Sequence, residues 1–512
     1  MSRKNGGIIG PANTPVGGLM TGVAGGVWRM NDVLDFVSNS QWPSAPQDIE
    51  NSTRFEKTSS DNLSRTSFGT PTLATKFTVS FWFKRTEFGV ANYLLGAYDG
   101  SSTNSVDWVF TTGDALSFYF GGNAGSGNLI QPNRVFRDAS AWYHLVYSVD
   151  TTQGTDSNRV KIYINGVQET SFSSATYPPQ NATCFLFNSS NNRIADNWNA
   201  SAAHSFNGYM AEFVHIDGQA LDPTSFGETD STTNIWKPRK IGAQFGSGGA
   251  GTNGFYLDFK DSSNLGNDQS GNNNDFTVNG LTSIDQSIDT CVNNFCTFNP
   301  LVNVPYSTYK EGDTFVDVTS TGNSSHHTNY GNIAFNSGKW YWEAKALGGN
   351  KYTIGLSDAN NQSHYQQVAG TNLMLGNQAN SYVSGDAIGW YSTTLYKNGS
   401  TVASSLSEIV TNDIMMVAVD ADNGKIYFGK NGTWRVANST TFDAAQNDTT
   451  FTTGEFYVSG FSNEDCDWSV NWGSPSYSIS SGNSDANGFG NFEYPVPSGY
   501  YALNTSNLNT YG

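Results

Sequence analysis

The chain has 512 residues, a formal net charge of −18, 14% aromatic residues and only 14% charged residues. A chain of this length predicts roughly two to four domains. Lys and Arg are too scarce to form the basic face that nucleic-acid binding requires, so we expect no nucleic-acid partner. No stretch of about 20 consecutive apolar residues is present, so we expect no membrane insertion.

The cysteine and histidine spacings indicate neither a disulfide framework nor a metal centre. The four cysteines are scattered, no CxxC pair suggests zinc, and no HExxH pattern joins the six histidines. Glycine and proline interrupt the N-terminal residues before the apolar part of a signal peptide could form, so we expect folding in a cytosol. That compartment disfavours a disulfide between Cys291 and Cys296, although the sequence leaves their redox state open.

Residues 1–51 form a glycine-rich N-terminal region in which we expect one short helix. Asn31 and Asp32 can cap its N-terminus, an apolar run follows them, and Pro43 ends it. A lone helix of this length is marginal in water, so it must pack against something. Two roles stay open: the helix packs on the first domain of its own chain, or it anchors the chain to a larger assembly.

Residues 52–228 contain short runs in which apolar and polar residues alternate, and these runs are rich in aromatic and β-branched side chains. This pattern is typical of half-buried strands. Between two such runs, Asn165 and Gly166 predict a hairpin turn with positive φ. Together these features predict an antiparallel β-sandwich. The runs are FTVSFWFKR (77–85), ALSFYFGG (115–122), WYHLVYSVD (142–150) and RVKIYINGVQ (159–168).

The order of these motifs resembles the concanavalin A-like, laminin-G-like family. The resemblance rests on the FTVSFWFK strand, the WxHLVxSxD strand, the KIYING hairpin and the segment FNGYMAEFVHIDGQAL at 206–221, in that order. It implies a sandwich of the jelly-roll type, a fold that also hosts glycosidases.

Residues 229–305 are interpreted as a connecting region that could pack on the first sandwich. Within it, side-chain oxygen atoms are spaced two residues apart around Gly271, as in a calcium loop. The loop lacks the glutamate that ends an EF-hand loop, and such clusters are ordinary turn chemistry. We therefore expect a plain turn without a metal or cofactor, with calcium as the alternative. The candidate calcium ligands are Asp268, Asn272 and Asp275, with Ser270 and Asn274 between them.

Residues 306–475 predict a second sandwich, because alternating runs such as SGKWYWEAKA (337–346) and YTIGLSD (352–358) recur along them. The segment DADNGKIYFGKNG (420–432) resembles the SPRY domain and places a tight turn on either side of one strand. That resemblance implies a module that binds proteins through its loops and is not a catalyst. Residues 476–512 are expected to be an extended tail, because Pro495 and Pro497 cannot donate to a sheet.

The sequence carries no catalytic signature, so we predict that the chain is not an enzyme. It has no GxSxG elbow, no phosphate-binding loop and no carboxylate triad of the glycosidase kind. Glu212 and Glu343 each stand alone in a strand, and we expect both to face solvent. Aromatic rings beside polar loops suit glycan binding. The loop candidates for ligand contact are Trp108, Trp198, Tyr365 and Tyr382, whereas Trp82, Trp142, Trp340, Trp342 and Trp468 are assigned to the cores.

The leader GGIIGPANTP, the two sandwiches and the closing PSGYYALNT resemble structural proteins of tailed-bacteriophage virions, of the tail-fibre or surface-decoration type. The resemblance implies assembly in the host cytoplasm and a place on the tail or capsid surface. It implies contact with other virion proteins through the N-terminal region, and with host-surface glycan or protein. A homo-oligomer is expected, and family habit suggests a trimer. Two alternatives stay open: a capsid decoration protein without a host ligand, and a polysaccharide depolymerase.

Overall fold

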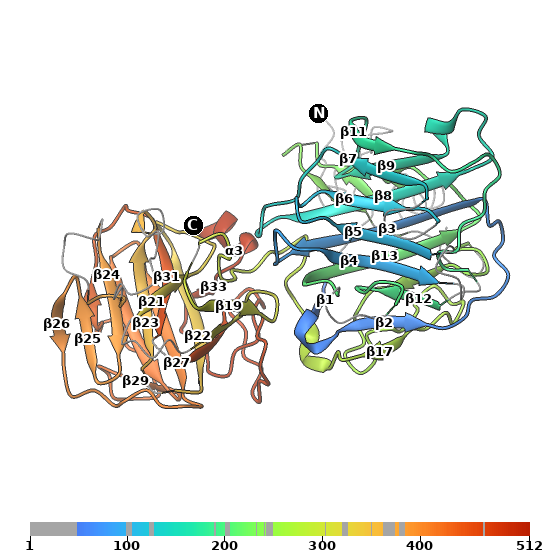
Figure 1. Cartoon of the computed structure of the whole chain (residues 1–512). Helices are drawn as coiled ribbons and strands as arrows, with labels where there is room; N and C mark the ends of the chain where they lie inside the picture. The colour runs from blue at the N-terminus through green and yellow to red at the C-terminus, as the bar shows by residue number, and fades with distance from the viewer. Residues whose placement is uncertain are drawn as a thin grey trace, which may run out of the picture.

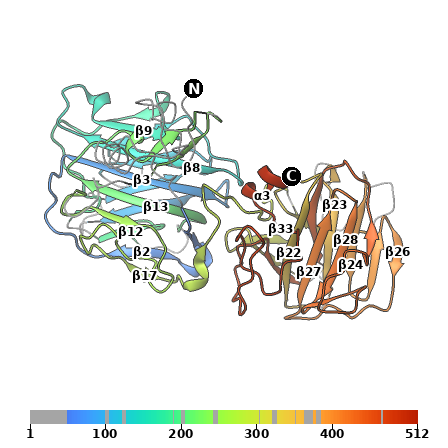
Figure 2. The same ribbon diagram turned by 180° about the vertical axis from the view of Figure 1, so that it is seen from behind.

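The computed structural model describes residues 49–98, 105–121, 127–188, 191–199, 205–231, 233–239, 241, 249–302, 304–319, 326–349, 351–361, 374–377, 385–463 and 466–512. It contains two antiparallel β-sandwiches side by side, with the C-terminus at their junction (Figure 1). Figure 2 shows the same arrangement from behind. The predicted all-β fold class is confirmed. The short helix expected near the N-terminus falls on residues outside the described ranges.

The first sandwich consists of two sheets around an aromatic-rich core. In sheet order, one contains β10 (Val167–Gln168), β9 (Val160–Ile164), β8 (Trp142–Asp150), β3 (Lys76–Arg85), β13 (Gly208–Asp217), β1 (Ser52–Phe55) and β18 (Gln286–Ser287), with β16 (Phe255–Leu257) also paired to β13. The other contains β11 (Phe172–Ala175), β7 (Leu129–Pro132), β6 (Leu116–Tyr119), β5 (Ser105–Phe110), β4 (Asn92–Tyr98), β12 (Asn191–Ile194), β2 (Asn62–Arg65) and β17 (Thr277–Asn279).

The Asn-Gly turn and the connecting region both contribute to this sandwich. Asn165 and Gly166 have φ values of 49° and 78°, which confirms the predicted hairpin between β9 and β10. The connecting region supplies β16, β17 and β18, so it adds strands to both sheets of the first sandwich. A small separate hairpin of β14 (Gly227–Thr229) and β15 (Trp236–Pro238) spans the boundary at residue 229. Short 3-10 turns are η2 (Lys57–Ser59), η3 (Asp156–Asn158), η5 (Pro223–Ser225) and η7 (Ser283–Asp285).

The second sandwich again packs two sheets around an apolar core. One sheet contains, in order, β19 (Ser307–Lys310), β20 (Phe315–Val318), β32 (Asp467–Asn471), β22 (Lys339–Leu347), β27 (Ile414–Asp420), β28 (Lys425–Lys430) and β29 (Thr433–Trp434), with β30 (Thr449–Thr450) on β28. The other contains β21 (His327–Tyr330), β31 (Tyr457–Asn463), β23 (Thr353–Asp358), β24 (Ala387–Tyr391), β25 (Thr394–Lys397) and β26 (Ser400–Ala403).

The C-terminal residues are not an extended tail, contrary to the sequence prediction. They form β33 (Tyr501–Ala502), which pairs in parallel with β22, and then the helix α3 (Thr505–Tyr511). The Asn504 side chain caps α3 by accepting a hydrogen bond from the Asn507 amide. The tail packs on the outer apolar face of the sheet, where Tyr341, Met416, Tyr427, Trp434, Phe492 and Tyr500 form one cluster. None of the helices in the described ranges is long and apolar enough to cross a membrane.

The expectation that Glu212 and Glu343 face solvent is wrong. Glu343 is fully buried and Glu212 is 5% exposed. The tail covers the outer side of β22, so the polar position of the alternating pattern is buried as well. Glu212 lies in a β-bulge of β13 at φ 52°, and both of its carboxylate oxygens accept hydrogen bonds from the Tyr256 hydroxyl, at 2.8–2.9 Å.

Polar contacts join the two sandwiches, which, together with the segments packed on them, we call the first and second modules. The Tyr209 hydroxyl of the first module donates to the Gly312 carbonyl at 2.8 Å, and the Glu311 amide donates to the Glu56 carboxylate at 2.8 Å. Arg54, which is fully buried, lies 3.6 Å from Glu311. These groups lose their hydration at the joint and pair across it, so the joint fixes how the modules sit against each other.

Candidate functional site

The outer face of the first sheet carries tryptophan side chains near the joint. In β3, Phe81 and Phe83 point into the core, so Trp82 between them points to the opposite face. The antiparallel register places Trp82 opposite His144 of β8, and Lys84 opposite Trp142. These residues therefore share one face, which the β14–β15 hairpin and the connecting region partly cover.

Three rings form a stack on this face. The His144 ring lies between Trp82 and Trp236, with centroid distances of 4.6 and 5.9 Å and interplanar angles of 23° and 22°. The indole N–H of Trp236 donates to Nδ1 of His144 at 3.0 Å, which fixes Nδ1 as an acceptor. The ring proton is then on Nε2, which donates to Ser80 Oγ at 2.9 Å. Burial lowers the pKa of His144 to about 3, so the ring is neutral and structural.

Two glycines allow Trp236 to lie this close to the sheet. A Cβ atom added to Gly166, in the β9–β10 turn, or to Gly227, at the start of the hairpin, would come within 2.4 Å of the Trp236 ring. Gly166 also has positive φ, so the turn chemistry and the ring packing require glycine at the same position. The hairpin thus carries Trp236, whose half-buried ring packs against the His144 ring and against Gly166 and Gly227.

A buried ion pair holds Trp142 beside the stack. Lys84 Nζ lies 2.8 Å from the Asp289 carboxylate and donates to the Asn294 side-chain oxygen at 2.7 Å. The indole N–H of Trp142 donates to the other Asp289 oxygen at 3.1 Å. Since the Lys84 and Asp289 side chains are 0% and 1% exposed, both charges are satisfied within the protein.

The rings of Trp82, Trp142 and Trp236 line a cavity of about 560 Å³, which we call the tryptophan cavity. Its volume falls in the range of about 300–1,000 Å³ that small-ligand sites occupy. Val167 and Ile235 are 62% and 63% exposed at its rim. Side-chain amides and hydroxyls complete the lining, beside the half-buried Cys291. The lining residues are Trp82, Trp142, Asn165, Val167, Thr229, Asn234, Ile235, Trp236, Cys291, Asn294 and Thr505.

The loop aromatic residues singled out from the sequence do not build this cavity. Trp108 is 1% exposed, lies in β5 and packs in the first core, so its assignment to a ligand-binding loop is wrong. The strand β5 runs through this position, so no loop is present there. Trp198 is half-buried and packs on Tyr98 at 4.7 Å between ring centroids, away from the tryptophan cavity. Tyr365 and Tyr382 lie outside the described residues.

The side chains proposed as calcium ligands form hydrogen bonds within their own loop and with the segment 251–256. The Asp268 carboxylate accepts from the Tyr256, Ser270 and Asn274 amides at 2.8–2.9 Å. Asp275 accepts from the Asp268 amide at 2.8 Å. The Asn272 side chain donates to the carbonyls of Gly251 and Gly254. Within the described ranges, no group of three or more His, Cys, Asp or Glu residues is arranged to hold a metal.

The described cysteines are free thiols, including Cys291 and Cys296. Sequence analysis placed Trp82 and Trp142 in the core and did not single out Trp236. The alternation in β3 contained the signal for Trp82, because a residue between Phe81 and Phe83 must point away from the core they fill. Nothing in the sequence shows that the hairpin returns Trp236 to this face.

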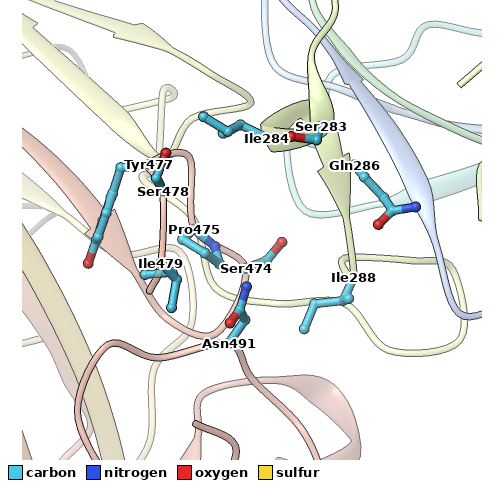
Figure 3. Close-up of a pocket in the computed structure, with 10 residues that line it drawn as sticks. All are labelled: Ser283, Ile284, Gln286, Ile288, Ser474, Pro475, Tyr477, Ser478, Ile479 and Asn491. Atoms are coloured by element: carbon cyan, nitrogen blue, oxygen red, sulfur yellow. The ribbon is translucent and has the colours of Figure 1, made fainter. Parts of the chain in front are cut away.

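A second cavity, of about 350 Å³, lies in the joint between the modules (Figure 3). Figure 3 shows Ile284, Gln286 and Ile288 on one side of it and Ser474 and Pro475 on the other. A polar group of its lining forms a hydrogen bond across the joint, since Ser474 Oγ lies 2.7 Å from Ser287 Oγ. These groups hold the modules together, so we assign this cavity to the joint.

Comparison with protein families defines both modules. Residues 58–225 match the Laminin_G_3 model, described as the concanavalin A-like lectin/glucanases superfamily, and residues 339–475 match the SPRY domain. The chain therefore combines a concanavalin A-like domain and a SPRY domain, two β-sandwich folds of the binding type. The tryptophan cavity is lined by residues of the first domain, of the connecting region and, at Thr505, of the C-terminal helix.

Several solved structures are similar to parts of this chain. The SPRY domain of human HERC1 is 18% identical, with 34% of this chain and 96% of that chain covered and a TM-score of 0.24. A heptameric SAP-like pentraxin from Limulus polyphemus is 16% identical, with 34% and 79% covered and a TM-score of 0.24. Domain 4 of AbnA, a GH43 extracellular arabinanase from Geobacillus stearothermophilus, is 21% identical, with 29% and 64% covered and a TM-score of 0.22. No curated protein sequence matches the chain significantly.

Proposed function

We propose that this chain is a structural protein of a tailed-phage virion, a tail fibre or adhesin, that binds glycan on the host surface through the tryptophan cavity. The observation that carries the binding role is the cavity itself. Half-buried indole rings there lie beside amide and hydroxyl groups, a combination that suits a sugar with one apolar face and polar edges. The rings are held in place before any ligand arrives, which reduces the entropic cost of binding.

The virion role rests on the sequence resemblance of the leader, the domain order and the closing segment. It assigns contact with other virion proteins to the N-terminal region and makes the chain a homo-oligomer, a trimer by family habit. The chain then works without a cofactor, without nucleic acid and without entering a membrane. Assembly takes place in the host cytoplasm, and the finished protein lies on the tail or the capsid surface.

A role without catalysis fits the positions of the carboxylates discussed above. Glycosidases need two carboxyl groups about 5–9.5 Å apart across the sugar. Glu212 and Glu343 lie in different modules, and tyrosine hydroxyls donate to both. No acidic residue lies among the described residues that line the tryptophan cavity. A depolymerase would instead release reducing ends from purified host polysaccharide, which a colorimetric assay detects.

Replacing Trp236 with alanine is expected to weaken adsorption of the protein to host cells or to their purified surface polysaccharide. A central aromatic residue of a binding site contributes about 2 kcal/mol or more, which corresponds to about 30-fold in Kd. Phe456→Ala is the matched control, because Phe456 is an aromatic residue that is 52% exposed and lies in the second module. Equal binding by both variants would remove the tryptophan cavity from the host-binding role.

Immunogold labelling of intact particles distinguishes a fibre from a decoration protein. We expect label at the tail or fibre tips. Label confined to the capsid shell, together with no adsorption to host cells, would favour a decoration protein without a host ligand. Absence of the chain from purified particles would contradict the virion role altogether.

A further inference from the structure

The tryptophan cavity lacks charged groups, although the chain as a whole carries a net charge of −18. None of the described residues that line it is Asp, Glu, Lys, Arg or His. The Cys291 thiol, which also lines it, is kept neutral because burial raises its pKa well above the usual value. A ligand in this cavity therefore meets rings, amides and hydroxyls.

Two groups of charges near the cavity offer nothing to a charged ligand. Lys84 and Asp289 lie under Trp142 and Asn294, are almost fully buried, and neutralise each other at 2.8 Å. On the hairpin, Lys237 lies 3.1 Å from Asp230 and 3.5 Å from Glu228. That group of three has one positive and two negative charges, so its net effect at the hairpin is to repel anions.

The polar groups at the rim suit hydroxyl groups of a ligand. Thr505 Oγ1 accepts from the Asn294 amide at 3.0 Å, which leaves its own O–H free to donate outward. The Asn165 side-chain oxygen accepts from the His144 amide at 2.7 Å, which leaves its NH₂ group as a donor. Thr229 and Asn234 of the β14–β15 hairpin are exposed and also line the cavity. Polar side chains thus reach the cavity from the β9–β10 turn, from the β14–β15 hairpin and from α3.

We propose, on the basis of the binding role given above, that the tryptophan cavity takes an uncharged pyranose unit and rejects sugars that carry a carboxylate. One apolar face of the sugar lies on the ring of Trp142 or Trp236, and its hydroxyls meet the amides and hydroxyls of the rim. A carboxylate would lose hydration in the cavity without gaining a cationic partner, which is unfavourable. It would also approach a protein of the same sign of charge.

The test compares matched pairs of oligosaccharides that differ only in a CH₂OH or a COO⁻ group: gluco- and glucurono-, galacto- and galacturono-, and manno- and mannurono-oligosaccharides. Binding to the full chain is measured by isothermal titration at low and high salt. We expect the neutral member of at least one pair to bind at least tenfold more tightly, with an affinity that changes less than twofold between 50 mM and 500 mM salt. Phe456→Ala, an exposed aromatic position of the second module, should retain binding, whereas Trp236→Ala should lose it.

Each contrary result has its own meaning. If a carboxylated sugar binds as tightly as its neutral partner, and Trp236→Ala abolishes both, the ligand class is wrong while the proposed binding role stands. If no member of any pair binds and Trp236→Ala leaves host adsorption unchanged, the binding role itself fails. If Trp236→Ala instead abolishes self-association of the chain, the cavity is an interface between copies and the inference is overturned. Thermal unfolding of each variant confirms that loss of binding is not loss of fold.

Discussion

Replacing Lys84 with methionine is expected to lower the free energy of unfolding by about 3–5 kcal/mol, because it leaves the buried Asp289 carboxylate without its counter-charge. Methionine retains the volume of the lysine stem, so the loss does not come from a cavity. The Asn294 side-chain oxygen also loses its donor. Chemical denaturation of the full chain measures the change, read on the transition of the first module.

A double-mutant cycle separates the charge effect from packing. Asp289→Asn alone leaves the Lys84 charge buried and should destabilise as strongly. The double variant Lys84→Met, Asp289→Asn removes both charges and should recover most of the lost free energy. Lys161→Met is the control, since Lys161 is a half-buried lysine of the same sheet without an ion pair in the described structure, and a change within about 0.5 kcal/mol is expected. A double variant no more stable than either single one would contradict this account.

The same variants connect stability to the tryptophan cavity. Asp289 also accepts the indole N–H of Trp142, so its carboxylate both neutralises Lys84 and orients the ring. In the double variant, asparagine keeps an oxygen for that indole, and ligand binding should be retained. Loss of ligand binding in a well-folded double variant would show that the charge of Asp289, and not only its oxygen, positions Trp142.

The sequence predicted the two sandwiches well, because strand periodicity is a local signal. Alternation of apolar residues in 77–85 and the Asn165–Gly166 turn each carry their own physical cause, and neither needs a distant partner. The tryptophan cavity was not predictable in the same way. Its rings come from β3, from β8 and from a hairpin that follows β13, so long-range packing alone brings them together.

Burial of the outer sheet faces explains the remaining errors. Alternation marks one face of a strand as buried and leaves the other face to solvent, which is why Glu343 was expected to be exposed. In this chain the C-terminal residues return across β22 and bury that second face. The prolines at 495 and 497 correctly exclude a regular strand there, but the short strand β33 and the helix α3 follow them. An exposed position of one sheet can be buried by a segment that is more than 100 residues away in sequence.

Replacing Glu343 with alanine is expected to detach the tail and to lower the free energy of unfolding of the second module by about 2–4 kcal/mol. Oε1 of Glu343 accepts from the Tyr341 hydroxyl and the Tyr494 amide, and Oε2 accepts from the Glu493 amide, at 2.8–2.9 Å. Alanine leaves these donors buried without an acceptor. Amide hydrogen exchange should accelerate at Glu493 and Tyr494 before it does in the β22–β27 pair.

Glu343 also predicts a pH dependence, with a definite sign. Burial raises its pKa from the usual 4.5 to about 7, so between these values the folded state binds more protons than the unfolded state. The stabilisation by this group is therefore fully present below pH 4.5 and is lost as the pH rises through about 7. Glu343→Gln cannot titrate and should flatten that part of the profile, while losing one of the accepted amide hydrogen bonds. Since Gln and Glu have nearly the same shape, identical pH profiles for the two proteins would show that the pKa of Glu343 is not shifted by folding and that its hydrogen bonds balance its burial.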